Sequence, residues 1–167
     1  NGGFATTPAG RGDLIRRTQE HTDNAWPGGE AHLALGFVRL WNLTGADRWR
    51  TYAEGILAAA AETATRAPAS SVTMIRAWSH LRHGQLTAVV VGDPQAAATQ
   101  ALLAAVRTHP DPELAIIPLT ACANHDWACL EGRRDLTVPQ VLICSGTTCH
   151  APAFTADEVA QRLRDHG

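Results

Sequence analysis

Lysine is absent from this sequence: all 14 basic residues are arginine, against 16 acidic residues, for a formal net charge of −2. Such a balance excludes a strongly basic nucleic-acid-binding module. Charged residues make up 18% of the chain and hydrophobic residues 45%, which excludes a disordered tail and a coiled coil. No run approaches the roughly 20 consecutive apolar residues that span a bilayer, so no membrane partner is expected. The 167 residues are enough for one domain or slightly more.

Several catalytic and cofactor-binding motifs are also missing. The chain has no G-x-S-x-G elbow and no H-E-x-x-H pair, so nucleophilic-serine and zinc-protease chemistry are not indicated. Neither G-x-G-x-x-G nor G-x-x-x-x-G-K-[ST] occurs. The segment Val91-Gly92-Asp93-Pro94 is therefore interpreted as a plain turn between a strand and a helix, and no cofactor is predicted.

The first half of the chain has the periodicity of helices. Residues 1–29 are rich in glycine and polar residues and are predicted to be irregular. Three helices follow, beginning at Glu30, at about Arg48 and after Ser70 or Ser71. Gly45 is suited to end the first helix and Asp47 to cap the second. The predicted apolar stripes are, in order, Leu33, Phe37, Leu40 and Trp41; Trp49, Tyr52, Ala53, Ile56 and Ala60; and Met74, Ile75, Trp78 and Leu81.

The second half has the texture of an α/β unit. Leu86–Val91 is a β-branched run typical of a strand buried on both faces, with Asp93 placed to cap a helix that ends near Thr108. Together with a strand at Leu114–Leu119 it predicts a βαβ unit. A third strand at Val138–Cys144 and a capping box at Thr155–Glu158 follow. The predicted fold class is mainly α plus α/β, with one domain at residues 1–84 and a small α/β segment with four cysteines at residues 85–167.

The densest polar cluster lies at the beginning of the first predicted helix, in residues 21–32. Its two carboxylates, Asp23 and Glu30, are candidates for an acid–base pair. Trp26 is a candidate platform for stacking on a sugar ring, and Arg17 and His32 are candidate substrate-binding residues. The alternative is that Asp23 makes a turn and Glu30 complements the helix dipole. The sequence leaves both interpretations open.

Four cysteines lie in the last 46 residues, as Cys122-x₆-Cys129 and Cys144-x₄-Cys149. These spacings are wider than the usual C-x₂₋₄-C of structural zinc sites, and the redox spacing C-x-x-C is absent. No export leader opens the chain, so a cytoplasmic location with reduced thiols is expected. If Cys144 ends one strand and Cys149 begins the next, the two could also face each other across a tight turn as a thiol pair.

Six short segments, in this order, resemble the C-terminal part of the spermatogenesis-associated thioredoxin-domain family. They are Gly2-Gly3-Phe4, Leu14-Ile15-Arg16-Arg17, Asp23–Gly29 (DNAWPGG), Arg39-Leu40 with Leu43-Thr44-Gly45, Val89–Pro94 (VVVGDP) and Cys144–Pro152 (CSGTTCHAP). Members of that family join a thioredoxin-like domain to an α/α toroid of the six-hairpin glycosidase type. The family loop commonly reads Asp-Gly-Ala-x-Pro-Ser-Gly-Asn, whereas Asn24, Gly28 and Glu30 stand at the Gly, Ser and Asn places here.

The resemblance implies a partial toroid and carbohydrate handling, without the thioredoxin-like domain. A closed toroid needs about twelve helices, and this chain supplies about three. Helices bearing Trp41, Trp49 and Trp78 therefore need a covering partner, expected to be the remainder of a longer polypeptide, a partner chain or a second copy. The resulting hypothesis is a structural or carbohydrate-handling module with no complete active site. The alternative is a thiol-redox or zinc-binding module that uses the C-terminal cysteines.

Overall fold

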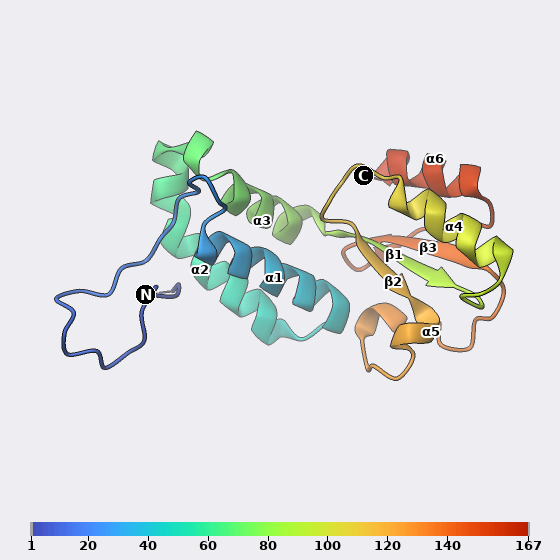
Figure 1. Cartoon of the computed structure of the whole chain (residues 1–167), viewed down its shortest axis with the longest axis horizontal. Helices are drawn as coiled ribbons and strands as arrows, with labels where there is room; N and C mark the ends of the chain where they lie inside the picture. The colour runs from blue at the N-terminus through green and yellow to red at the C-terminus, as the bar shows by residue number, and fades with distance from the viewer. Residues whose placement is uncertain (1, 167) are drawn as a thin grey trace. The chain divides into compact units, whose positions relative to one another are not determined.

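The structure, a computed structural model, describes residues 2–166, which form two compact units (Figure 1). The helical unit comprises residues 2–41 and 46–82, and the α/β unit comprises residues 42–45 and 83–166. The predicted fold class, α combined with α/β, is confirmed. Among the described residues, no helix is both long and apolar enough to cross a membrane.

Three α-helices and one short 3₁₀ helix build the helical unit. They are α1 (Gly29–Thr44), α2 (Asp47–Arg66), η1 (Pro68–Ser70) and α3 (Val72–His83). Gly45, between α1 and α2, has φ of +70°, so the prediction that it ends α1 in the left-handed conformation is confirmed. The predicted cap of α2 is wrong by one residue, because Ala46 is the N-cap and Asp47 is the first helical residue.

The buried face of α1 differs from the predicted stripe. The side chains with almost no exposure are Ala31, Ala34 and Val38, whereas Leu33 and Leu40 are 42% and 37% exposed. Alanines allow close helix approach, so the Ala31/Ala34 face packs into the core and the larger leucines lie beside it. The core of this unit consists of Ala31, Ala34, Ile56, Leu57, Ala60, Met74 and Ala77.

A second contact in the helical unit is aromatic. Phe37 of α1 stacks on Trp49 of α2 at a centroid distance of 5.7 Å, and Tyr52 and Phe4 lie within 6 Å of the Phe37 ring. Arg48 lies over Trp49, and Arg50 lies over Trp41. Two of the three tryptophans expected to need an outside partner are therefore covered in part by neighbouring side chains of α1 and α2.

The α/β unit is built on a four-stranded mixed sheet. The strands are β1 (Leu86–Val91), β2 (Ala115–Pro118), β3 (Gln140–Ser145) and β4 (Thr148–Cys149), in the order β2-β1-β3-β4. Strands β1 and β2 are parallel and joined through α4 (Ala97–Arg107), which confirms the predicted βαβ unit. The pairs β1–β3 and β3–β4 are antiparallel. The predicted burial of β1 on both faces is confirmed over its whole length.

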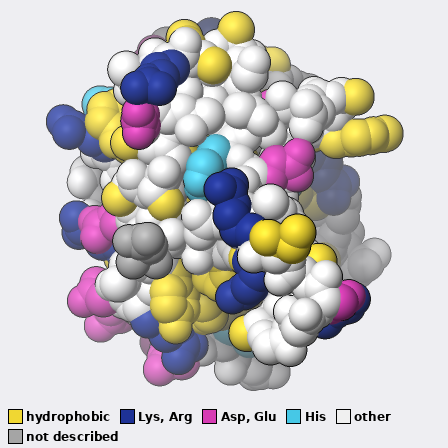
Figure 2. Space-filling view, turned by 90° about the vertical axis from the view of Figure 1, so that its left-hand side faces the viewer, with side chains coloured by type: hydrophobic (Ala, Val, Ile, Leu, Met, Phe, Trp, Pro, Cys, Tyr) yellow, Lys and Arg dark blue, Asp and Glu magenta, His cyan; other side chains and the backbone are white. Residues whose placement is uncertain are grey.

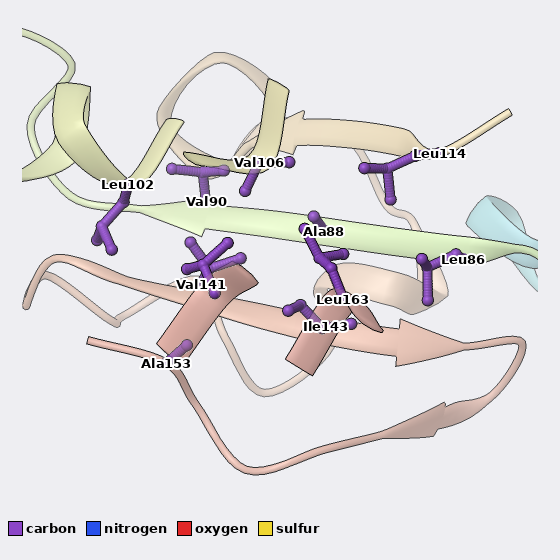
Figure 3. Packing of buried hydrophobic residues seen from close by; sticks show 11 residues of the cluster. Leu86, Ala88, Val90, Leu102, Val106, Leu114, Val141, Ile143, Ala153 and Leu163 are labelled. Atoms are coloured by element: carbon purple, nitrogen blue, oxygen red, sulfur yellow. The ribbon is translucent and has the colours of Figure 1, made fainter. Parts of the chain in front are cut away.

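Each face of the sheet has its own core. Helices α4 and α6 (Ala156–His166) cover one face, and α5 (Leu119–Cys122) with η2 (Ala128–Leu130) covers the other (Figure 1). Figure 3 shows side chains of β1 and β3 meeting Leu102 and Val106 of α4 and Leu163 of α6. On the opposite face, Val89 and Val91 pack with Leu119, Leu130 and Leu142.

Several predicted boundaries move. Helix α4 begins at Ala97 rather than directly after Asp93, because the Asp93 carboxylate accepts the Gln95 N–H at 2.9 Å and closes a turn. Strand β2 ends at Pro118, α5 begins at Leu119, and β3 begins at Gln140 rather than Val138. The capping box at α6 is confirmed: Thr155 Oγ1 accepts the Glu158 N–H, and Glu158 Oε2 accepts the Thr155 N–H.

Truncation in the core of the α/β unit tests this packing. Ile143 of β3 is fully buried, so Ile143→Ala should lower the free energy of unfolding of this unit by about 2–5 kcal/mol. The control is Ile15→Ala, since Ile15 is fully exposed and makes no core contact. Urea denaturation followed by circular dichroism measures both, and equal effects would contradict the packing described.

Candidate functional site

The Asp23 carboxylate lies between the beginnings of two helices. Oδ1 accepts the Gly28 N–H at 2.8 Å, directly before α1, and Oδ2 accepts the Thr73 N–H at 2.8 Å, in the first turn of α3. The main-chain N–H of Asp23 also donates to the Ser70 carbonyl at 2.6 Å. Asp23 therefore caps α3 from 50 residues away in the sequence and ties the polar loop to it.

These contacts decide the ionisation of Asp23. Burial raises the pKa of the carboxyl, but the N–H donors of Gly28 and Thr73 and the positive charge of His32 more than offset it. The pKa of Asp23 therefore lies below its ordinary value. A carboxylate held charged by two backbone donors is a good cap and a poor proton donor near neutral pH.

Glu30, the second candidate carboxylate, is also held by the chain itself. It is only 4% exposed, and its Oε1 accepts the Phe4 N–H. Its Oε2 lies 2.7 Å from His21 Nδ1, an ion pair by distance when the imidazole is protonated. Glu30 thereby connects the N-terminal segment to the first turn of α1.

The three remaining candidates have different surroundings. Arg17 donates from Nε and Nη2 to the Thr7 carbonyl, at 3.1 and 2.9 Å, and thus closes the N-terminal loop. Trp26 is 82% exposed. His32 is exposed on α1, and its charge acts on Asp23. The structure brings Asp23 and His32 into electrostatic contact, whereas Arg17 is engaged with the backbone and Trp26 projects into solvent.

The helical unit also has a groove that none of these five residues lines. It has a volume of about 950 Å³ and runs between α2 and α3. On α3, Ile75 is 41% exposed and Trp78 is 50% exposed, with the Arg82 guanidinium 5.1 Å from the Trp78 ring. On α2, the lining combines small or apolar residues with three polar or charged ones: Leu57, Ala58, Ala61 and Ala64, and Arg50, Glu54 and Thr65. On the face of the molecule in Figure 2, hydrophobic side chains gather in patches between charged ones.

The four cysteines divide into two pairs of different state. Cys144 and Cys149 are joined by a disulfide, while Cys122 and Cys129 are free thiols and half-buried. The expectation of four reduced thiols is therefore wrong for one pair, because the two-residue turn places Cys144 directly opposite Cys149. Burial raises the pKa of the Cys129 thiol, against the opposing charge of Arg133.

A zinc site built on the four cysteines needs their thiolates, and two of the four sulfurs are bonded to each other. Within residues 2–166, no group of three or more His, Cys, Asp or Glu side chains is arranged to hold a metal ion.

Sequence reasoning missed two features of these sites. Arg133 Nη2 donates to Cys149 Sγ at 2.8 Å. The two residues are 16 positions apart, and no sequence motif predicts their contact. The groove between α2 and α3 was also missed, although the spacing of Ala58, Ala61 and Ala64 on one helix could have indicated a shallow apolar face.

Comparison with known proteins supports the family resemblance. The chain is 34% identical over 108 residues to spermatogenesis-associated protein 20 of Rattus norvegicus and 32% identical to that of Mus musculus. The matched region is 64% of this chain but 14% of each relative's length. No family model matches the chain, and no solved structure matches it.

Removing the Asp23 carboxylate should destabilise the helical unit. Asp23→Ala leaves the Gly28 and Thr73 N–H groups without their acceptor, and we expect a loss of about 1–3 kcal/mol at pH 7. Asp13→Ala is the control, because that carboxylate is exposed and pairs with Arg11 at the surface, so its removal should leave stability unchanged.

The effect should depend on pH with a definite sign. Since the folded pKa of Asp23 lies below the unfolded value, its contribution is complete above about pH 5 and disappears as pH falls through the folded pKa, below about 4. Denaturation of wild type and Asp23→Ala across this range measures the difference. If the difference in free energy of unfolding between wild type and Asp23→Ala stayed unchanged down to pH 2, the capping role of the charged carboxylate would be contradicted.

Proposed function

We propose that this chain is a structural part of a larger protein and holds no complete active site. Its helical unit packs against further helices of that longer polypeptide. The matched region corresponds to 14% of the length of the two relatives. Their other regions would supply the additional helices of the toroid that the family resemblance implies. The α1–α2 hairpin and α3 are then units of that helical assembly.

The state of the candidate carboxylates supports a structural role. A general acid or base needs a proton-transfer partner in the substrate. Asp23 instead spends both oxygens on backbone N–H groups, and Glu30 is buried against Phe4 and His21. Both therefore stabilise the loop and the helix ends in this chain.

The groove between α2 and α3 is the observation that carries the proposal. A helix with an apolar face would fit it, with Trp78 and Ile75 at one wall and the alanines of α2 as the floor. Arg82, which also lines the groove, would pair with an acidic residue on that helix. The occupant we assign is a helix from the remainder of the longer polypeptide. In the two relatives, most of the sequence lies outside the matched region, so a longer polypeptide of this kind would contain such a helix.

Solvent access at Trp78 tests this assignment. We expect the native polypeptide, detected through this segment, to be much larger than 17.8 kDa, and its Trp78 to be protected from oxidative footprinting. In the isolated 167-residue chain, Trp78 should be oxidised readily. Trp26 is the internal control, since it is 82% exposed and should react in both.

Two results would contradict the proposal. One is a native polypeptide of 17.8 kDa whose Trp78 reacts as fast as Trp26. The other is protection of Trp78 that appears only on dimerisation of the 17.8 kDa chain, which would make a second copy the occupant.

Carbohydrate binding is the second candidate function, and the exposure of Trp26 favours it. An indole ring that is 82% exposed beside a polar loop is suited to stack on a sugar face. His32 lies on the adjoining helix and could donate a hydrogen bond to a hydroxyl group.

Calorimetric titration of the assembled protein with mono- and disaccharides tests this second function. We expect saturable binding that Trp26→Ala weakens by roughly tenfold and that Phe154→Ala, a truncation of an exposed aromatic residue in the α/β unit, leaves unchanged. The absence of saturable heat, or equal effects of both variants, would contradict a sugar site at this loop.

A further inference from the structure

We propose that the Cys144–Cys149 pair is a dithiol–disulfide exchange site, in which Cys149 is the accessible sulfur and Arg133 stabilises its thiolate. This goes beyond the structural role proposed above and is confined to the α/β unit. The pair lies on the β3–β4 hairpin, where Cys144 and Cys149 are cross-strand partners with Cα atoms 3.9 Å apart. The two sulfurs can therefore separate and rejoin without a change of strand register.

The hairpin holds this geometry independently of the disulfide. Ser145 pairs with Thr148 next to the turn, and the His150 N–H donates to the Ile143 carbonyl at 2.9 Å beyond the cysteines. In the turn, Gly146 has φ of +58°, and its N–H donates to the Gln85 carbonyl at 3.2 Å. Reduction would therefore leave the two thiols facing each other.

The two cysteines differ in accessibility. Cys149 is exposed on the edge strand β4, whereas Cys144 is 2% exposed within β3. An external thiol can approach Cys149 Sγ, while Cys144 is shielded from it. An exposed nucleophile with a buried partner is the arrangement that dithiol exchange requires.

Arg133 supplies the charge at the accessible sulfur. Its Nη2 donates to Cys149 Sγ at 2.8 Å, and its Nη1 donates to the Cys129 carbonyl, which fixes the guanidinium plane. The Arg133 backbone N–H also donates to the carbonyl of Leu130, a fully buried residue of η2. A neutral disulfide sulfur is a weak acceptor, so this contact becomes strong only when Cys149 carries a negative charge.

A purely structural staple fits the pair less well. The stabilisation from a disulfide grows with the length of the loop that it closes, and this one closes a separation of five residues. The hairpin already has its own hydrogen bonds, as described above.

The exchange balances with an external dithiol as the reductant. One of its thiolates attacks Cys149 Sγ, the Cys144–Cys149 bond breaks, and Cys144 leaves as a thiolate that takes up a proton. The second thiol of the reductant loses its proton and attacks the reductant's first sulfur, which is bonded to Cys149 in the mixed disulfide. Cys149 is released as a thiolate beside Arg133. The reductant is oxidised to a disulfide, and the cysteine pair gains two electrons.

The first test measures the ionisation of Cys149 alone. In a Cys144→Ser background, the rate of alkylation of Cys149 as a function of pH should give a pKa below about 7.5. Arg133→Gln should return it to about 8.5. Arg134→Gln is the matched control, because Arg134 lies next in the chain but bonds to His125 and Asp126, and it should change nothing.

The second test measures the redox equilibrium of the otherwise unaltered chain in glutathione buffers at pH 7. Thiol alkylation followed by peptide mass mapping gives the fraction of the Cys144–Cys149 pair that is reduced. Arg133→Gln should disfavour the reduced form by roughly threefold to tenfold, and neither Arg134→Gln nor Cys129→Ser should do so.

Three results would overturn the proposal. They are an ordinary pKa for Cys149, equal effects of Arg133→Gln and Arg134→Gln, and a disulfide that excess dithiol fails to reduce in the folded protein. None of these readouts depends on the groove or on a partner helix, so this proposal and the structural function can fail separately.

Discussion

The helical unit depends on one carboxylate that satisfies backbone donors at two helix beginnings. The first N–H groups of a helix have no partner within the helix and need an outside acceptor. Asp23 supplies it for Thr73 of α3 and also binds Gly28 before α1. An isolated polar loop before a helix can be read as a binding site, but here the same oxygens hold two helices together. The same carboxylate oxygens could serve a substrate or cap the helices, and the contacts of Asp23 favour the capping role.

Much of the fold could be predicted from local sequence, because the signals act over a few residues. The helix end at Gly45, the capping box at Thr155 and the burial of β1 all depend on neighbours in the chain. The buried face of α1 could not be predicted, since the choice between its leucines and its alanines depends on how closely α2 and α3 approach. Likewise, no local rule assigns a cap to α3 from a residue 50 positions away.

In the candidate sites too, the features set by neighbours in the chain could be predicted, and those set by packing could not. The Cys144–Cys149 pair was a candidate because a turn between two strands places flanking residues opposite each other, and their spacing is visible in the sequence. Arg133 was not, because its contact with Cys149 joins two segments that only the folded chain brings together. The groove between α2 and α3 requires the packing of two helices before it exists. The catalytic and sugar-binding roles of residues 17–32 stay predictions.

The central position of β1 also has a consequence for synthesis on the ribosome. This strand lies between β2 and β3 and is buried along its entire length, yet both partners are translated after it. Between the emergence of Val91 and that of Gln140, an uncharged β-branched segment has no complete sheet to join. Such a segment is prone to aggregate in a nascent chain. Slow translation of residues 92–139 would lengthen this interval, so binding by a chaperone would be most valuable at that stage.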